Sequence, residues 1–121
     1  MSRTSEQRQG AWAEQRVLRL LSARGWQLLD RNWRCRWGEL DLVMAKTGRL
    51  LLVEVKARRR PGPDGGGRGA LGVHKRLRLE RAWLCWVAAH PHWGATPVEQ
   101  VAALVPLPPA RKPVLWIRMG G

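Results

Sequence analysis

The 121-residue sequence lacks tyrosine and phenylalanine, so all eight aromatic residues are tryptophan. It has only two cysteines, Cys35 and Cys85, and their positions form no spacing typical of a zinc site. They could pair, but two buried free thiols are the better expectation, and such sparse cysteine use fits a reducing cytoplasm. No disulfide or zinc staple is needed, because a chain of this length with 45% hydrophobic residues can bury a core as one domain, residues 1–121.

Long hydrophobic runs are also missing. No uncharged apolar run approaches the roughly 18 residues that a membrane span requires. The first ten residues read MSRTSEQRQG and include no apolar segment of the kind found in secretory signals. The sequence therefore predicts a cytoplasmic protein without a membrane partner.

Acidic residues are scarce: nine stand against 22 basic residues, which gives a net charge of +13. Such an excess favours binding to a polyanion, most simply nucleic acid. The charge recurs in three clusters, which are Arg31, Arg34 and Arg36; Arg58, Arg59 and Arg60; and Lys75, Arg76 and Arg78. Codon bias of a GC-rich genome is an alternative origin, because arginine outnumbers lysine 18 to 4.

Hydrophobic spacing predicts a helix, three strands, a second helix and two further strands, which is a mixed α/β fold with about five strands flanked by helices. The first helix has a capping box at Thr4–Gln7 and ends near residue 24, before Gly25. Gly10 lies inside it, and close packing on a sheet would explain a glycine there. The apolar stripe of this helix is Ala13, Val17, Leu20 and Leu21.

The remaining elements follow from apolar runs and turn residues. Strands are expected over 26–33, 38–45, 50–57, 98–105 and 114–118. The second helix is expected over 71–90, with Val73, Leu77, Leu84, Val87 and Ala88 facing the core beside Trp83 and Trp86. Residues 58–70 are rich in glycine, proline and arginine, so they are predicted to form a flexible loop.

The strands over 38–45 and 50–57 bring acids and a lysine together. If Thr47-Gly48 is a two-residue turn, position 46 pairs with 49, Asp41 lies opposite Glu54, and Glu39 lies opposite Lys56. These four side chains share one face, while Leu40, Leu42, Met44, Leu51, Val53 and Val55 form an apolar face that belongs in the core.

Two opposed carboxylates repel each other, and a divalent cation would resolve that conflict. Mg²⁺ (or Mn²⁺) prefers such oxygen ligands, and Lys56 adds a cation that can position water or neutralise charge on a phosphate. A metal ion and a lysine side chain together can catalyse phosphodiester hydrolysis. The alternative is a solvated strand face with a Glu39–Lys56 ion pair.

The string GELDLV at 38–43, followed by LVEVK at 52–56 and an arginine run, resembles the YraN-like family of bacterial proteins. That family is similar to the PD-(D/E)XK nucleases, which include restriction endonucleases and archaeal Holliday-junction resolvases. The resemblance covers about residues 10–88 and includes Gly10, Ala13, Glu14, Asn32, Arg34, Lys75 and the Ala82-Trp83-Leu84 stretch. It departs at 97–101, where the family carries an Arg-Phe-Asp stretch, and this puts contacts made from that strand in doubt.

The resemblance implies a restriction endonuclease-like fold and a role for each matching residue. Asp41 and Glu54 would bind the metal with the Val55 carbonyl, Glu14 would complete the acidic site, and Lys56 would orient water or stabilise the transition state. Glu39 would be a supporting acid or an ion-pair partner. The expected nucleic-acid contacts are Arg34, Arg36, Trp37, Arg58, Arg59, Arg60, Lys75 and Arg76.

Three functions follow from these features. The first is a metal-dependent DNA endonuclease, with branched or damaged DNA suggested by superfamily analogy alone. The second is a basic nucleic-acid-binding module without catalysis. The third is an interaction protein whose acidic patch is structural. Resolvases of this fold act as dimers, so a homodimer is a further expectation.

Overall fold

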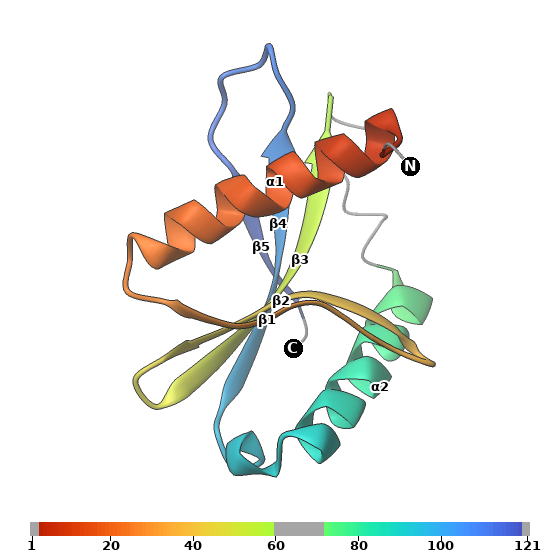
Figure 1. The fold of residues 1–121 in the computed structure, drawn as a ribbon, viewed down its shortest axis with the longest axis vertical. Helices are drawn as coiled ribbons and strands as arrows, with labels where there is room; N and C mark the ends of the chain where they lie inside the picture. Colours follow the sequence, from red (N-terminus) through yellow and green to blue (C-terminus); the bar gives the residue numbers. More distant parts are fainter. Residues whose placement is uncertain (1–2, 60–71, 120–121) are drawn as a thin grey trace.

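The computed structural model describes residues 3–59 and 72–119. Helix α1 (Ser5–Ser22) precedes strands β1 (Gln27–Cys35), β2 (Gly38–Lys46) and β3 (Arg49–Arg58), and helix α2 (Val73–Ala89), the short 3₁₀ helix η2 (Pro91–Trp93) and strands β4 (Val98–Pro106) and β5 (Leu115–Met119) follow (Figure 1). The predicted order of helices and strands is confirmed. Of the loop expected over 58–70, Arg58 belongs to β3 and residues 60–70 lie outside the described residues.

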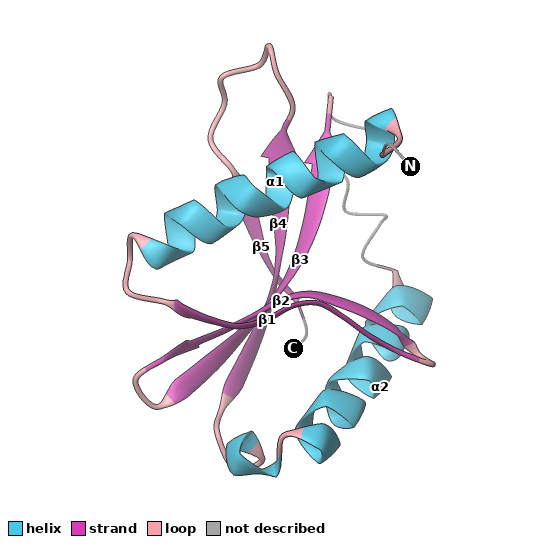
Figure 2. Cartoon of the chain, viewed as in Figure 1, coloured by secondary structure: helices cyan, strands magenta, loops and turns pink. Residues whose placement is uncertain are grey.

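The five strands form one mixed sheet in the order β1-β2-β3-β4-β5. All neighbours pair antiparallel except β3 and β4, which are parallel and are joined through α2. Helix α1 packs on one face of the sheet and α2 on the other, so the strands lie between two helical layers (Figure 2). This is the predicted α/β fold, and it is consistent with the restriction endonuclease-like fold.

The hairpin register is confirmed: Lys46 pairs with Arg49, and the ladder continues to Leu42 and Val53. Gly48 adopts φ +75°, which glycine reaches without steric cost. Further from the turn than Leu42 and Val53, β2 and β3 no longer pair. In that region β2 stays paired with β1, and β3 stays paired with β4. Figure 1 shows β1 and β2 curving away together from β3. The sheet therefore opens at the position of the predicted site.

Several packing predictions are wrong. Leu20 is 41% exposed, whereas Ala13, Val17 and Leu21 are buried as expected. Leu40 packs on the α2 side rather than with Leu42 on the α1 side. The apolar face of the hairpin is thus not continuous, because β1 and β2 twist where they leave β3.

The buried face of α2 was predicted in part: Trp83 and Trp86 are buried as expected, but most of the expected aliphatic residues are not. Val73, Leu77 and Leu84 are 45–62% exposed, whereas the buried stripe is Leu79, Ala82, Trp83 and Trp86. This stripe has the same helical spacing as the expected one, and it includes two tryptophans. Burying their larger area outweighs burying a row of aliphatic residues.

Gly10 does not make the close contact that was expected, because a Cβ atom added there would meet nothing within 4 Å. Both cysteines are free and only half-buried, so the expectation of free thiols holds but that of full burial does not. None of the helices in the described residues is long and apolar enough to cross a membrane.

Candidate functional site

The two central acids lie where β2 and β3 separate. Asp41 Oδ2 accepts a hydrogen bond of 2.8 Å from the Val55 N–H, so a carboxylate takes the place of a strand partner. Glu54 is 7% exposed and is the one buried charged residue within the described residues. Burial, and next the charge of Glu54, raise the pKa of Asp41 to about 8. The two carboxyl groups therefore face the same space, as the predicted pairing required.

Two lysines approach the same oxygen of Glu54. Lys75 Nζ lies 2.9 Å from Glu54 Oε1, and Lys56 Nζ lies 3.5 Å from it. Lys56 follows Glu54 by two residues on β3 and so shares its face, whereas Lys75 comes from the first turn of α2. Burial, and next the neighbouring Lys75 amine, lower the pKa of Lys56. Burial also opposes the charge of Lys75, but its hydrogen bonds, first to Glu54, outweigh burial and raise its pKa.

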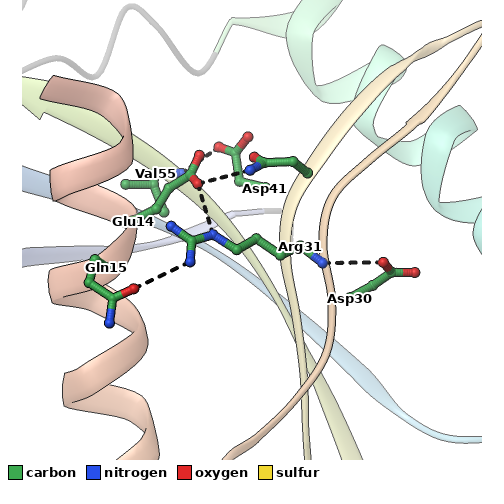
Figure 3. Close-up of polar contacts among 7 residues, drawn as sticks. Glu14, Gln15, Asp30, Arg31, Asp41 and Val55 are labelled. Atoms are coloured by element: carbon green, nitrogen blue, oxygen red, sulfur yellow. Dashed lines mark hydrogen bonds and ion pairs between the residues drawn. The ribbon is translucent and has the colours of Figure 1, made fainter. Parts of the chain in front are cut away.

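Glu14 reaches the site from α1. Its carboxylate accepts hydrogen bonds from Arg31 Nε at 3.3 Å and from Asn32 Nδ2 at 3.2 Å. Figure 3 shows the Glu14 and Asp41 carboxyl groups facing each other, and the charge of Glu14 contributes to the raised pKa of Asp41. Asn32 has φ +53°, an uncommon conformation for a non-glycine residue. It follows Arg31 in β1, so two successive residues of this strand contact Glu14.

Glu39 does not pair with Lys56, contrary to the predicted arrangement. It binds Arg34 instead, with Arg34 Nε 3.2 Å from Glu39 Oε2, because Arg34 is its partner in the β1–β2 ladder. The opposition of Glu39 and Lys56 required the β2–β3 ladder to continue beyond Leu42. It ends there, so Glu39 moves away with β1 while Lys56 remains on β3.

The site is a pocket of about 360 Å³. Its lining includes Glu14, Glu39, Asp41, Glu54 and Val55, with Trp37, Lys56, Lys75 and Arg78. A second hollow shares Glu14 and Glu39 with it and continues past Arg3, Arg31 and Arg34 at the other side. Acids therefore line the middle of a depression whose two sides carry basic residues.

The predicted nucleic-acid contacts do not all lie together. Arg34 is exposed beside the second hollow, and Trp37 lines the pocket under the guanidinium groups of Arg36 at 4.5 Å and Arg81 at 4.8 Å from its ring centroid. Arg58 ends β3 on the face of Glu54 and Lys56.

Three other residues expected to contact nucleic acid are not among the described residues that line the pocket. Arg59 is exposed directly after β3, and Arg60 lies outside the described residues. Arg76 lines a different groove, between α2 and β4, together with Glu99 of the strand that departs from the family pattern.

Sequence reasoning missed the place of two arginines in the site, although it had noted both as members of basic clusters. Arg78 lines the pocket, and its spacing of three from Lys75 on a helix was the available signal. Arg31 pairs with Glu14 across 17 residues of sequence, and no local pattern indicates such a contact.

The donor set fits a hard divalent cation. Asp41 and Glu54 supply two neighbouring carboxylates, and Mg²⁺ needs only one or two from a protein when water and phosphate complete its shell. Burial, and next the charge of Glu54, raise the pKa of Asp41, and a bound cation would offset both effects. Among the described residues no three His, Cys, Asp or Glu side chains form a ready metal-binding group. Asp41 and Glu54 would thus be the protein's principal ligands.

The chain is similar to a group of bacterial proteins. A UPF0102 protein of Prochlorococcus marinus (strain MIT 9303) is 55% identical over 112 residues, covering 93% of this chain and 89% of that protein. UPF0102 proteins of Synechococcus sp. (strain CC9902) and Pseudomonas putida (strain GB-1) are 50% and 39% identical, covering 94% and 98% of this chain and 94% and 96% of those proteins. The profile of the uncharacterised protein family UPF0102 matches residues 13–105. The chain therefore belongs to UPF0102, the YraN-like family that its motifs resemble, and a place in the PD-(D/E)XK superfamily is consistent with this membership.

Proposed function

We propose that this protein is a metal-dependent endonuclease that hydrolyses phosphodiester bonds in DNA, with Mg²⁺ or Mn²⁺ as its cofactor. The observation that carries the proposal is the pair of adjacent carboxyl groups of Asp41 and Glu54, with the Lys56 ammonium 3.5 Å from Glu54, at the point where the sheet opens. Two carboxyl groups this close resist ionising together, and a divalent cation between them would relieve that conflict.

Each side chain has a role that its position supports. Asp41 and Glu54, with the Val55 carbonyl, would hold the cation, and Glu14 would orient water in its shell. A bound divalent cation would polarise the phosphate and lower the pKa of the attacking water. Lys56 would donate hydrogen bonds to the phosphate oxygens or to that water, where charge develops in the transition state. The basic residues on both sides of the pocket would hold the DNA backbone.

The experiment is a cleavage assay on linear, nicked and four-way-junction DNA, with Mg²⁺, with Mn²⁺ and with EDTA. Cleavage is expected with metal, and Lys56→Ala should lose roughly 10²–10³-fold of the rate while still binding DNA. Lys112→Ala removes the same charge at an exposed position outside the pocket and should leave the rate unchanged. Absence of cleavage with either metal on every substrate would refute the proposal.

A non-catalytic nucleic-acid-binding module is the second candidate. It is favoured by the net charge of +13. Such a module would bind DNA with strong salt dependence and without cleavage in any metal. A protein that binds no DNA at moderate salt would fit neither candidate, but would fit the interaction protein instead.

A further inference from the structure

Two ammonium groups share a single oxygen of Glu54. Lys75 makes the shorter contact, at 2.9 Å, and Lys56 lies at 3.5 Å. Two ammonium groups that contact one oxygen also repel each other. One lysine would suffice to neutralise Glu54, so the second needs a reason other than ion-pair stability.

The residue type is informative as well. The sequence has four lysines among 22 basic residues, and two of these four meet at Glu54. The other ion pairs within the described residues use arginine, on Glu14, Glu39 and Glu99, or the His90 ring. An arginine fork holds one carboxylate in a fixed geometry, whereas an ammonium group on a flexible stem can exchange one oxygen partner for another.

The surroundings of Lys75 favour an anion as that other partner. It is the third residue of α2, and the first turn of this helix has no acidic residue. The free N–H groups and the dipole of a helix N-terminus attract negative charge. Arg78 lies on the same side of α2 and lines the same pocket. The α2 wall of the pocket is therefore suited to a phosphate group.

We propose that Lys75 is a second phosphate-binding lysine of this site, held on Glu54 until a divalent cation takes over that carboxylate. The inference rests on the proposed function, because it needs a cation at Asp41 and Glu54. A cation bound by Glu54 would weaken the attraction of that carboxylate for the Lys75 ammonium, so the lysine would be released to contact the phosphate of the substrate. Cation binding and DNA binding then strengthen each other, and this linkage is reciprocal.

The proposal predicts opposite effects on the two ligands, which a structural ion pair would not produce. Lys75→Gln removes a competitor from Glu54, so Mn²⁺ should bind at least about fivefold more tightly in the absence of DNA. The same variant should lose at least about fivefold more DNA affinity with metal than without it. A lysine that only anchors α2 to the sheet would leave Mn²⁺ binding unchanged or weaker when removed.

The experiment uses the full chain. Electron paramagnetic resonance measures Mn²⁺ binding, and fluorescence anisotropy measures binding of a labelled DNA oligonucleotide with and without Mn²⁺ at constant ionic strength, while a gel verifies that the DNA stays intact. Lys112→Gln is the matched control, because it removes an exposed lysine outside the pocket. It should leave Mn²⁺ binding unchanged and weaken DNA binding equally in both conditions.

A second variant covers the case in which Lys75→Gln does not fold, as judged by circular dichroism. Lys75→Arg keeps the charge and the link between α2 and the sheet, but its fork should hold Glu54 more firmly and weaken Mn²⁺ binding. Unchanged Mn²⁺ affinity in both variants, or equal loss of DNA affinity with and without metal in Lys75→Gln, would overturn the inference. If the parent cleaves DNA and Lys75→Gln behaves like Lys112→Gln, only this inference fails. If the parent binds no Mn²⁺, the proposed function fails with it.

Discussion

Replacement of Asp41 by asparagine should flatten the pH dependence of folding stability in the metal-free protein. Burial, and next Glu54, raise the pKa of Asp41 from 3.8 to about 8 in the folded state. In the unfolded chain an aspartate titrates near pH 3.9. Between these pH values the folded protein keeps a proton that the unfolded chain has lost, so the free energy of unfolding falls as the pH rises from about 4 to about 8.

The size of this effect follows from the shift. One pKa unit corresponds to about 1.4 kcal/mol, so a shift of about four units corresponds to at most about 6 kcal/mol over the whole window. This is a large share of the roughly 5–15 kcal/mol that stabilises a typical domain. Asparagine keeps an oxygen that can accept the Val55 N–H but has no proton to lose. The variant should therefore exceed its parent in stability at pH 8 and resemble it near pH 4.

The assay is urea unfolding followed by tryptophan fluorescence at several pH values between 4 and 8.5, in EDTA. Glu99→Gln is the control, because Glu99 is an exposed carboxylate that does not line the pocket. Its Oε1 lies 3.0 Å from Arg118 Nε. The difference between this variant and the parent should stay nearly constant across the window. Parallel curves for the parent and Asp41→Asn would show that Asp41 holds no extra proton, and would refute the reasoning. Mg²⁺ at pH 8 should stabilise the parent but not the asparagine variant. The ion would bind the folded protein only where the Asp41 carboxylate is present, and it would not bind the unfolded chain.

Two further predictions concern packing, and thermal and urea unfolding test both. Gly10→Ala should stabilise the protein by about 0.5–1 kcal/mol, because a Cβ meets open space there and alanine is the better helix former; a loss of stability would reveal a contact or strain that the structure does not contain. Leu21→Ala should cost about 2–5 kcal/mol and its neighbour Leu20→Ala less than about 1 kcal/mol, since Leu21 is buried and Leu20 is 41% exposed; equal losses would contradict the orientation of α1.

Local patterns were enough to predict the frame of the site. The capping box at Thr4 and Gln7 starts α1 as expected, and both of its hydrogen bonds are present, at 2.8 and 3.1 Å. The turn at Thr47-Gly48 sets the β2–β3 register, so the convergence of Asp41 and Glu54 could be counted from the turn. These features depend on residues close in sequence, whose geometry is set by backbone sterics and by the two-residue period of a strand.

Long-range packing decided the rest, because it compares surfaces that no local pattern describes. Which residues of α2 join Trp83 and Trp86 in the core depends on which surface buries more area against the sheet, and Leu79 and Ala82 do so in place of Val73, Leu77 and Leu84. The β2–β3 ladder ends at Leu42, so Glu39 does not reach Lys56 and pairs instead with Arg34, its partner in the β1–β2 ladder. Glu14 approaches from α1, which is distant in sequence from β2 and β3. Lys75 reaches Glu54 only because α2 begins beside the opened strands. The sequence by itself thus determined the family, the order of elements and the central acids with Lys56. The tertiary structure decided which distant residues contact the acids, such as Arg31 on Glu14 and Lys75 on Glu54. Each of these contacts joins segments whose relative position depends on the whole core.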